Sequence, residues 1–185
     1  MMFNPQRAFI LFLIIISLAG CQPPVSGEAT SWQRPYLEWQ LSQDRLKLPL
    51  MIPVEGVKIS QIQDTWGAAR SAGRKHEGVD IFAKRGTPVL SSTQGIVRRM
   101  NQNSLGGTVV WIIGPDRSMH YYAHLDAYAA HIQVGDWVEA GETIAYVGNT
   151  GNAKNTPPHL HYGIYKSTGA VNPFPYLTGE LPEVD

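Results

Sequence analysis

Only one cysteine, Cys21, occurs in the 185 residues, so no intrachain disulfide can form. Neither sign of charge is in excess, because 15 Lys and Arg residues are matched by 15 Asp and Glu residues. Binding to a nucleic-acid backbone depends on a basic excess, so nucleic acid is not an expected partner. Hydrophobic residues make up 43% of the chain, which is enough for an ordinary core in one domain.

The apolar run near the N-terminus, Ala8 to Ile16, is too short for a comfortable membrane span, which needs about 20 residues. It follows Arg7 and has the layout of a secretory signal. Its ending, Leu18-Ala19-Gly20-Cys21, resembles a bacterial lipobox, whose cysteine is acylated and becomes the first mature residue. The resemblance implies a lipoprotein signal peptide over residues 1–20 and a lipidated Cys21 that anchors the chain to a membrane. The alternative is a short uncleaved anchor with an incidental cysteine.

The residue after the cysteine, Gln22, bears on the location. By resemblance to lipoproteins of Gram-negative bacteria, the absence of Asp at this position favours the outer membrane. We therefore expect the chain in the cell envelope, held by lipid at the periplasmic face of the outer membrane.

The region from 21 to 50 is expected to hold the lipidated cysteine, a Pro-rich tether and a short helix that packs on the main domain. Several of its apolar residues have near-helical spacing. They are Trp32, Tyr36, Leu37, Trp39, Leu41 and Leu46. Core packing is the simpler interpretation of this stripe, and a docking surface for an adaptor or activator is the alternative.

The chain contains no long amphipathic helix after Pro53, so the domain expected over residues 51–178 should be all-β and antiparallel, with a tail over 179–185. Short β-branched or aromatic runs alternate there with Gly, Asn, Asp and Pro. The expected strands are 88–91, 95–100, 107–113, 119–124, 143–147 and 159–165.

Two segments about eighty residues apart carry the ligand types of catalytic zinc: His76-Glu77-Gly78-Val79-Asp80 and His159-Leu160-His161. Catalytic zinc takes three protein ligands and leaves a fourth position for water. In an extended strand, residues two apart share a face, so His159 and His161 point to the same side. The same parity, or one helical turn, brings His76 and Asp80 together. Gly78 and the β-branched residues beside Asp80 favour a loop that runs into a strand.

A third segment, Ser118 to Leu125, is aromatic-rich and is expected to form a strand with His124 at its end. His120 shares strand parity with Tyr122 and His124, which makes it a candidate beside the substrate. Each feature alone has a structural explanation, since a lone histidine is usually a surface or satisfied core residue. The combination is stronger, because five of the six histidines fall in these three segments.

The motifs and their order resemble lysostaphin-type (LytM-like) zinc endopeptidases. The resemblance rests on Asp64-Thr65-Trp66-Gly67-Ala68-Ala69-Arg70, Arg74 to Ala83, Gly86-Thr87-Pro88-Val89, Tyr122-Ala123-His124-Leu125, Gly148-Asn149-Thr150-Gly151, Pro158-His159-Leu160-His161-Tyr162 and Asn172-Pro173. It covers roughly residues 52 to 175. The resemblance implies a barrel-sandwich hybrid fold, and the Gly-turn segment 134–144 resembles the hammerhead-like turn of biotinyl and lipoyl domains.

Carried over by position, the resemblance implies that His76, Asp80 and His161 bind one Zn²⁺ and that His124 and His159 are catalytic. Some relatives are kept latent by an upstream asparagine on the zinc, but no Asn lies between Cys21 and His76. Four further residues are weaker candidates for substrate binding. They are Arg70, His120, Tyr122 and Tyr162.

The expected activity is hydrolysis of peptide cross-links in peptidoglycan, with the D-alanyl–diaminopimelate bond favoured over glycine bridges. The substrate class comes from the resemblance and the export signal. The alternative is a non-catalytic cell-wall-binding or amidase-activating module, although members of that kind usually lack one or more of the five site residues. A phosphocarrier shares the barrel and a histidine pair, but an exported chain has no access to cytoplasmic phosphoenolpyruvate.

Overall fold

The computed structural model describes residues 27–28, 33–70 and 73–180. The strands are β1 (Gly27–Glu28), β2 (Val79–Phe82), β3 (Pro88–Leu90), β4 (Gly95–Asn103), β5 (Gly107–Ile113), β6 (Met119–Tyr128), β7 (Asp136–Val138), β8 (Thr143–Val147), β9 (His159–Lys166) and β10 (Gly169–Val171). The helices are α1 (Arg34–Gln43) and α2 (Phe174–Thr178), with single 3₁₀ turns at Ile59–Gln61, Pro115–Arg117 and Gly151–Ala153. The described part of the chain is therefore mostly β, as the sequence predicts.

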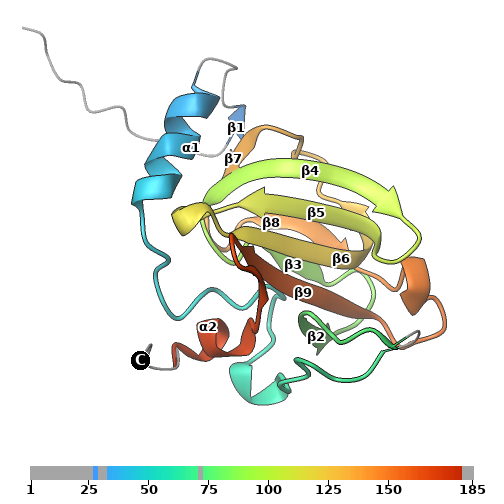
Figure 1. Ribbon diagram of the computed structural model, residues 1–185. Helices are drawn as coiled ribbons and strands as arrows, with labels where there is room; N and C mark the ends of the chain where they lie inside the picture. The colour runs from blue at the N-terminus through green and yellow to red at the C-terminus, as the bar shows by residue number, and fades with distance from the viewer. Residues whose placement is uncertain (1–26, 29–32, 71–72, 181–185) are drawn as a thin grey trace, which may run out of the picture.

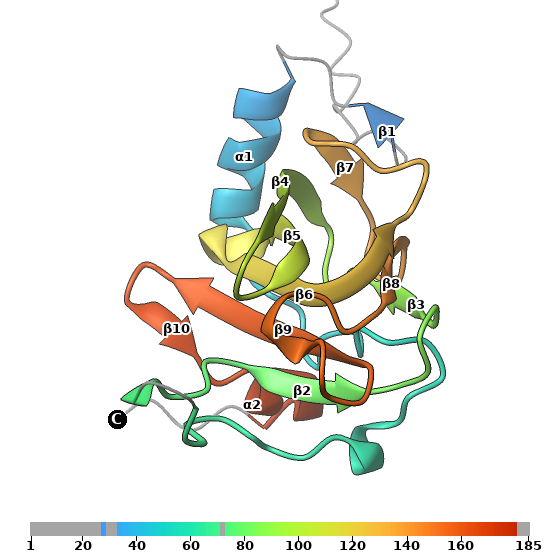
Figure 2. The same ribbon diagram turned by 90° about the vertical axis from the view of Figure 1, so that its right-hand side faces the viewer.

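Every strand pair in the sheet is antiparallel, with the order β1-β7-β4-β5-β6-β8-β3 and with β9 pairing β6, β2 and β10. The sheet curls on itself, so that β3 and β8 lie behind β5 and β6 in Figure 1, and the turned view in Figure 2 shows the same curl. Its inner face encloses one core of Val, Ile, Leu and Tyr side chains, among them Val89, Val110, Ile144 and Leu160. This curled antiparallel architecture confirms the predicted fold class.

Strand β6 pairs with two neighbouring strands in succession. Its first half, Met119–Ala123, pairs β9, and its second half pairs β8 from Leu125 onward. His124 stands at the change of partner with a φ of 64°, a left-handed conformation that is uncommon for a residue other than glycine. The pairing with β5 is also irregular here, because between two successive paired positions β6 advances by three residues and β5 by two. The alternation of faces therefore breaks at His124.

Helix α1 covers one end of the sheet beside β1 and β7 (Figure 1). A proline in its first turn suits a helix start, and Leu37 and Leu41 are buried against Ile96 and Trp137. The packing interpretation of the N-terminal stripe therefore holds for these two leucines. Tyr36 and Trp39 of the same stripe remain exposed on the outer side.

The expectations for the signal peptide, Cys21, Trp32 and the final tail residues 181–185 lie outside the described residues. Among the residues that are described, no helix combines the length and the apolar character that crossing a membrane requires.

A chain of hydrogen bonds runs through the core at His120, which is fully buried. The Ser118 hydroxyl donates to the Pro115 carbonyl at 2.6 Å and lies 2.9 Å from Nε2 of His120, so Nε2 carries the proton. Nδ1 then accepts from the Tyr162 hydroxyl at 2.7 Å. Burial, with a smaller contribution from Lys166, lowers the pKa of His120 to about 3. His120 is therefore neutral in the folded protein at pH 7.

The lowered pKa of His120 predicts a pH-dependent loss of stability. The unfolded state protonates this imidazole below pH 6.5, whereas the folded state does not until about pH 3, so stability is full above pH 6.5 and falls as the pH drops. The free energy of unfolding should fall by about 1.4 kcal/mol per pH unit in this window because of His120. Urea unfolding between pH 4 and 7 of chelator-treated wild type and His120→Gln tests this. The free energy of unfolding should fall more steeply with falling pH in the wild type, by that amount per pH unit. Equal slopes would contradict the assignment.

Candidate metal centre and catalytic groove

Antiparallel pairing brings the predicted ligands together. In the β2–β9 ladder Asp80 lies opposite His161 and Phe82 lies opposite His159, so both pairs share one face of the sheet. His76 lies in the loop just before β2, as the sequence predicts. His124 approaches the same face from the bulge in β6, with its ring centroid 5.0 Å from that of His159 and 5.9 Å from that of His161. All five predicted metal and catalytic residues therefore meet at one place.

Three of these residues converge on a single point. Nε2 of His76 lies 2.9 Å from Nδ1 of His161, and both nitrogens lie 3.0 Å from Oδ1 of Asp80. Zinc binds imidazole nitrogen at about 2.0–2.1 Å and carboxylate oxygen at about 2.0–2.2 Å. A triangle of donors with these edges can be capped by one such ion. In the described part of the chain, the cluster of side chains that could hold a metal ion consists of His76, Asp80 and His161.

The hydrogen bonds around His76 show why this cluster suits a cation. Nδ1 of His76 lies 2.8 Å from the Thr65 carbonyl, which accepts its proton, so neutral His76 presents a lone pair at Nε2. Nδ1 of His161 and the carboxylate of Asp80 face that lone pair at hydrogen-bond distance. Three converging electron pairs repel one another unless a cation or a shared proton lies between them. The donor chemistry thus fits Zn²⁺.

Arg70 supports the carboxylate from the other side. Its guanidinium pairs with Oδ2 of Asp80, which leaves Oδ1 for the two imidazoles. Burial alone would raise the pKa of Asp80, but its contacts with His161, His76 and Arg70 outweigh burial and hold that pKa well below its usual range. Asp80 is therefore ionised across the whole physiological range. Burial also lowers the pKa of His161, which keeps its imidazole neutral.

The remaining two imidazoles are oriented by backbone carbonyls. Nδ1 of His124 donates to the Thr150 carbonyl at 2.9 Å, and Nδ1 of His159 donates to the Pro157 carbonyl at 2.8 Å. Each ring therefore carries its proton on Nδ1 and keeps Nε2 free. Nε2 of His159 lies 4.0 Å from Oδ1 of Asp80. Burial, with smaller contributions from His159 and His161, lowers the pKa of His124 to about 4, so its Nε2 can accept a proton at pH 7.

The loop after β8 holds the bulge of β6 in place. Besides the carbonyl bond to His124, the Thr150 hydroxyl donates to the Leu125 carbonyl and accepts from the Thr108 amide, both at 2.9 Å. The amide of His124 donates to the Gly106 carbonyl at 2.7 Å. His124 is thus clamped on both sides, which stabilises its left-handed backbone.

Gly78 separates His76 from Asp80 and lies directly under His161. A Cβ at this position would stand 2.6 Å from the Tyr162 carbonyl oxygen and 2.7 Å from Cε1 of His161. Only glycine leaves room for the imidazole to lie against the backbone of β2. The glycine of the first motif is therefore required by close packing.

A groove of about 630 Å³ opens over the imidazole cluster. Sequence reasoning missed two half-buried tyrosines that line it, Tyr121 and Tyr165, whose rings pack at a tilt against Trp111 at centroid distances of 4.3 and 5.4 Å. Tyr121 also meets His161 edge-on at 5.9 Å. Strand parity could have found Tyr121, since it lies two residues before Ala123, which is paired with His161.

Of the predicted substrate-binding residues, Arg70 borders the groove. The placement of His120, Tyr122 and Tyr162 beside the substrate is wrong for this structure, since all three are fully buried. The Tyr122 hydroxyl accepts from the Ser92 amide at 2.9 Å inside the core, and Tyr162 bonds to His120. For His120 and Tyr122 the physical reason is the bulge at His124, which turns the His124 side chain to the opposite face. Tyr162 is buried because it alternates with His161 along β9.

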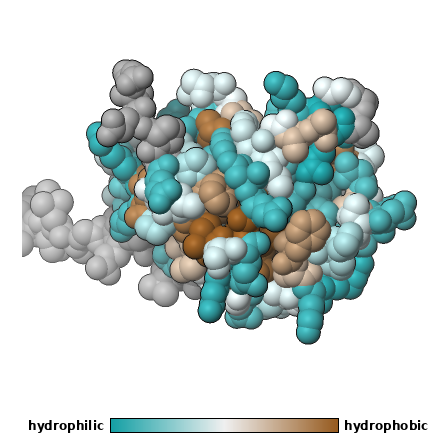
Figure 3. Space-filling model, turned by 90° about the horizontal axis from the view of Figure 1, so that it is seen from below, coloured by the Kyte–Doolittle hydropathy of each residue, from teal (hydrophilic) through white to brown (hydrophobic). Residues whose placement is uncertain are grey.

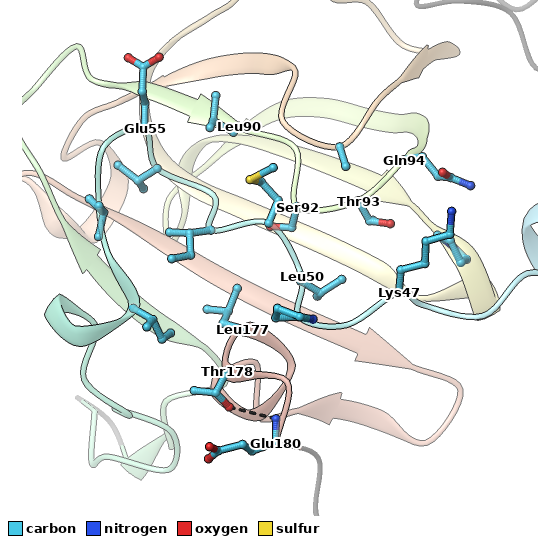
Figure 4. Close-up of a pocket in the computed structure, with 18 of the residues that line it drawn as sticks. Lys47, Leu50, Glu55, Leu90, Ser92, Thr93, Gln94, Leu177, Thr178 and Glu180 are labelled. Atoms are coloured by element: carbon cyan, nitrogen blue, oxygen red, sulfur yellow. Dashed lines mark hydrogen bonds between the residues drawn. The ribbon is translucent and has the colours of Figure 1, made fainter.

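A larger cavity of about 1020 Å³ lies elsewhere, between the segment 44–59 and the C-terminal helix. Apolar side chains gather at this face in the view from below (Figure 3), and Figure 4 shows Leu50 and Leu177 within it and Lys47 at its margin. The cavity contains no cluster of imidazoles and carboxylates. Among the described residues, the clustered imidazoles and carboxylate therefore lie in the smaller groove.

Comparison with known proteins agrees with this geometry. The chain is 42% identical over 126 residues to an L-Ala–D-Glu endopeptidase of Bacillus subtilis, a match that covers 62% of this chain and 39% of that protein. It is 34% identical over 132 residues to the DD-carboxypeptidase/endopeptidase Mpg of Neisseria meningitidis, covering 70% and 28%. The chain thus spans well under half the length of these relatives.

Solved structures show the same fold. The catalytic domain of lysostaphin from Staphylococcus simulans superposes with a TM-score of 0.56 at 31% identity, covering 63% of this chain and 90% of that domain. A zinc-containing peptidase from Vibrio cholerae superposes with a TM-score of 0.59 at 25% identity, covering 71% and 40%. The family model described as peptidase family M23 matches residues 74–173, which include all five clustered site residues. The chain belongs to peptidase family M23.

Proposed function

We propose that the chain is a zinc-dependent endopeptidase that hydrolyses peptide bonds of peptidoglycan. The observation that carries the proposal is the triangle of His76, Asp80 and His161, whose ligand atoms lie within 3.0 Å of one another beside two further imidazoles. Relatives whose names include L-Ala–D-Glu endopeptidase and peptidoglycan DD-endopeptidase support the substrate class. The complete set of five residues favours catalysis over a non-catalytic wall-binding module.

In this proposal His76, Asp80 and His161 hold the ion, and His124 and His159 handle protons. A bound zinc ion supplies Lewis acidity, which polarises a carbonyl and acidifies a water molecule. With their Nδ1 protons held by carbonyls, His124 and His159 both present Nε2 to the groove. One Nε2 would accept the proton of the attacking water. The other ring would act in its protonated form, in which Nε2 carries a proton that stabilises the oxyanion or passes to the leaving amine. Arg70 fixes Asp80 in the orientation that this requires.

The bond proposed for cleavage is the D-alanyl–diaminopimelate cross-link, which agrees with the DD-endopeptidase names among the relatives. A second candidate is the L-Ala–D-Glu bond of the stem peptide. The 42% identity to an endopeptidase named for that bond favours it.

We further propose that Cys21 is lipidated and holds the enzyme at the periplasmic face of the outer membrane. Its partners in this proposal are the peptidoglycan substrate and a protein adaptor or activator. The support is the position of the chain's single cysteine directly after Leu18-Ala19-Gly20 and the preceding apolar run. Several acyl chains on one residue anchor a protein firmly, whereas a single chain binds only marginally.

Two histidine variants separate metal binding from proton transfer. His161→Ala should lose both zinc and activity, because it removes one corner of the donor triangle. His159→Ala should keep one zinc per chain and lose turnover by about 10²- to 10⁴-fold, the usual contribution of a proton-transferring side chain. Metal analysis and rate measurement on both variants test the assignment. Stoichiometric zinc in His161→Ala would contradict it.

Digestion of defined muropeptides, read by mass spectrometry, identifies the bond. Cleavage of the D-alanyl–diaminopimelate bond should convert cross-linked dimers into monomers, whereas cleavage of the L-Ala–D-Glu bond should release stem peptides and leave L-Ala on the muramic acid. Chelation of zinc should abolish either product. Digestion that persists in excess chelator, or intact muropeptides with zinc-loaded enzyme, would overturn the proposed function.

Replacement of the cysteine tests the anchor. Cys21→Ala should move the protein from the membrane fraction to the soluble envelope fraction, since the acylated side chain is lost. The intact mass of the detergent-extracted wild type should exceed that of its polypeptide by the mass of the acyl groups. A wild-type mass equal to that of the bare polypeptide would contradict lipidation.

A further inference from the structure

A short hairpin at one edge of the groove carries three cationic side chains, Arg70, Arg74 and Lys75. Its two arms are held by a bridge between Ala69 and Lys75 and by the Arg70 amide, which donates to the Arg74 carbonyl at 2.9 Å. The arm that carries Arg74 and Lys75 leads directly into His76, so the cations stand within a few residues of the proposed metal ligands. All three residues are exposed.

The charge around the groove is one-sided. The acidic residues that line it are Glu77 and Asp80, and the carboxylate of Asp80 already contacts Arg70, His76 and His161. The rest of the lining includes neutral residues, namely Leu105, Gly106, Asn152, Ala153 and Thr156. A ligand in the groove therefore meets net positive charge at the hairpin, which favours a ligand with an anionic group facing the hairpin.

The proposed substrates carry such a group beside the bond that is cut. In the D-alanyl–diaminopimelate cross-link, the carbon that holds the leaving amine also holds a free carboxylate. The same is true of the L-Ala–D-Glu bond, because D-glutamate continues the stem peptide through its side-chain carboxyl. A glycine bridge has no carboxylate at this position. Arginine and lysine side chains bind carboxylates through charge-assisted hydrogen bonds.

We propose that the hairpin of Arg70, Arg74 and Lys75 is a specificity site for the free carboxylate next to the scissile bond. The inference rests on the proposed endopeptidase activity and deepens it, since it names the chemical group by which the enzyme selects its substrate. Arg70 is shared between this site and Asp80, whereas Arg74 and Lys75 are exposed on the other arm of the hairpin. Arg74 and Lys75 are therefore the residues to vary.

The test compares two matched pairs of muropeptides that differ by one carboxylate. In the first pair, the diaminopimelate carboxyl at the cross-link is free or is a carboxamide. In the second pair, the stem residue is D-glutamate or D-isoglutamine. The enzymes are zinc-loaded wild type, the double variant Arg74→Gln/Lys75→Gln, and Lys47→Gln. Lys47 is an exposed cation at the margin of the other cavity (Figure 4), which makes it a matched control for loss of positive charge.

Wild type and Lys47→Gln should cut the free acid at least about tenfold faster, in kcat/KM, than the carboxamide, because one charge-assisted hydrogen bond is lost in the amide. In the double variant this ratio should fall towards one, chiefly through a slower reaction with the acid, while the rate on the amide is retained. Raising the ionic strength should shrink the wild-type ratio as well, since exposed charges are screened.

Three outcomes decide between the hypotheses. If acid and amide are cut equally by wild type, the carboxylate site is wrong and the endopeptidase remains. If the double variant keeps the full preference, the preference arises elsewhere and the assignment to the hairpin is wrong. If zinc-loaded wild type cuts none of the four substrates, the proposed function itself fails.

Discussion

The structure depends on one electrostatic constraint, which is that three electron-pair donors are held about 3 Å apart in a largely buried place. Such an arrangement is unfavourable without a cation, since each donor loses solvation and repels the others. The antiparallel ladder between β2 and β9 enforces it by setting Asp80 opposite His161. The loop before β2 enforces it by tying His76 to the Thr65 carbonyl. The stability of the surrounding sheet holds the three donors in this arrangement, and a bound cation would remove their mutual repulsion.

The second requirement of the proposed mechanism is that two more imidazoles present a free Nε2 to the groove. Their backbone partners achieve this, because the carbonyls of Thr150 and Pro157 take the Nδ1 protons and fix which nitrogen faces the groove. Burial then keeps His124 neutral, with its pKa lowered to about 4. The same loop that orients His124 also lines the groove through Asn152, Ala153 and Thr156. In the proposed enzyme, proton transfer and substrate binding are therefore linked through one segment of the chain.

Much of this could be predicted from the sequence, and the reasons are local. Strands bounded by Gly, Asn and Pro were predictable from β-branched and aromatic runs, and β5 and β8 have the predicted bounds. The parity of His159 and His161 and the spacing of His76 and Asp80 predicted that the proposed ligand residues would lie together. The role of Thr65 was not predictable, because it acts through a backbone carbonyl that any residue could supply. The helix α2 was also missed, although the Phe174 amide at its start donates to Oδ1 of Asn172 and Gly179 ends it in a left-handed conformation.

The one failure of parity shows where sequence reasoning reaches its limit. Regular alternation predicts that His120, Tyr122 and His124 share a face, and this would hold in a flat strand. The strand changes partner at His124, so the residue takes a left-handed conformation and its side chain crosses to the groove. Nothing in the residue types near His124 signals that conformation, because the carbonyls that stabilise it belong to Gly106 and Thr150, far away in the sequence. His120 and Tyr162, left on the inner face, then satisfy each other in the core, and the aromatic wall of the groove falls instead to Tyr121 and Tyr165. A single backbone irregularity thus leaves His120 in the core and turns His124 to the groove.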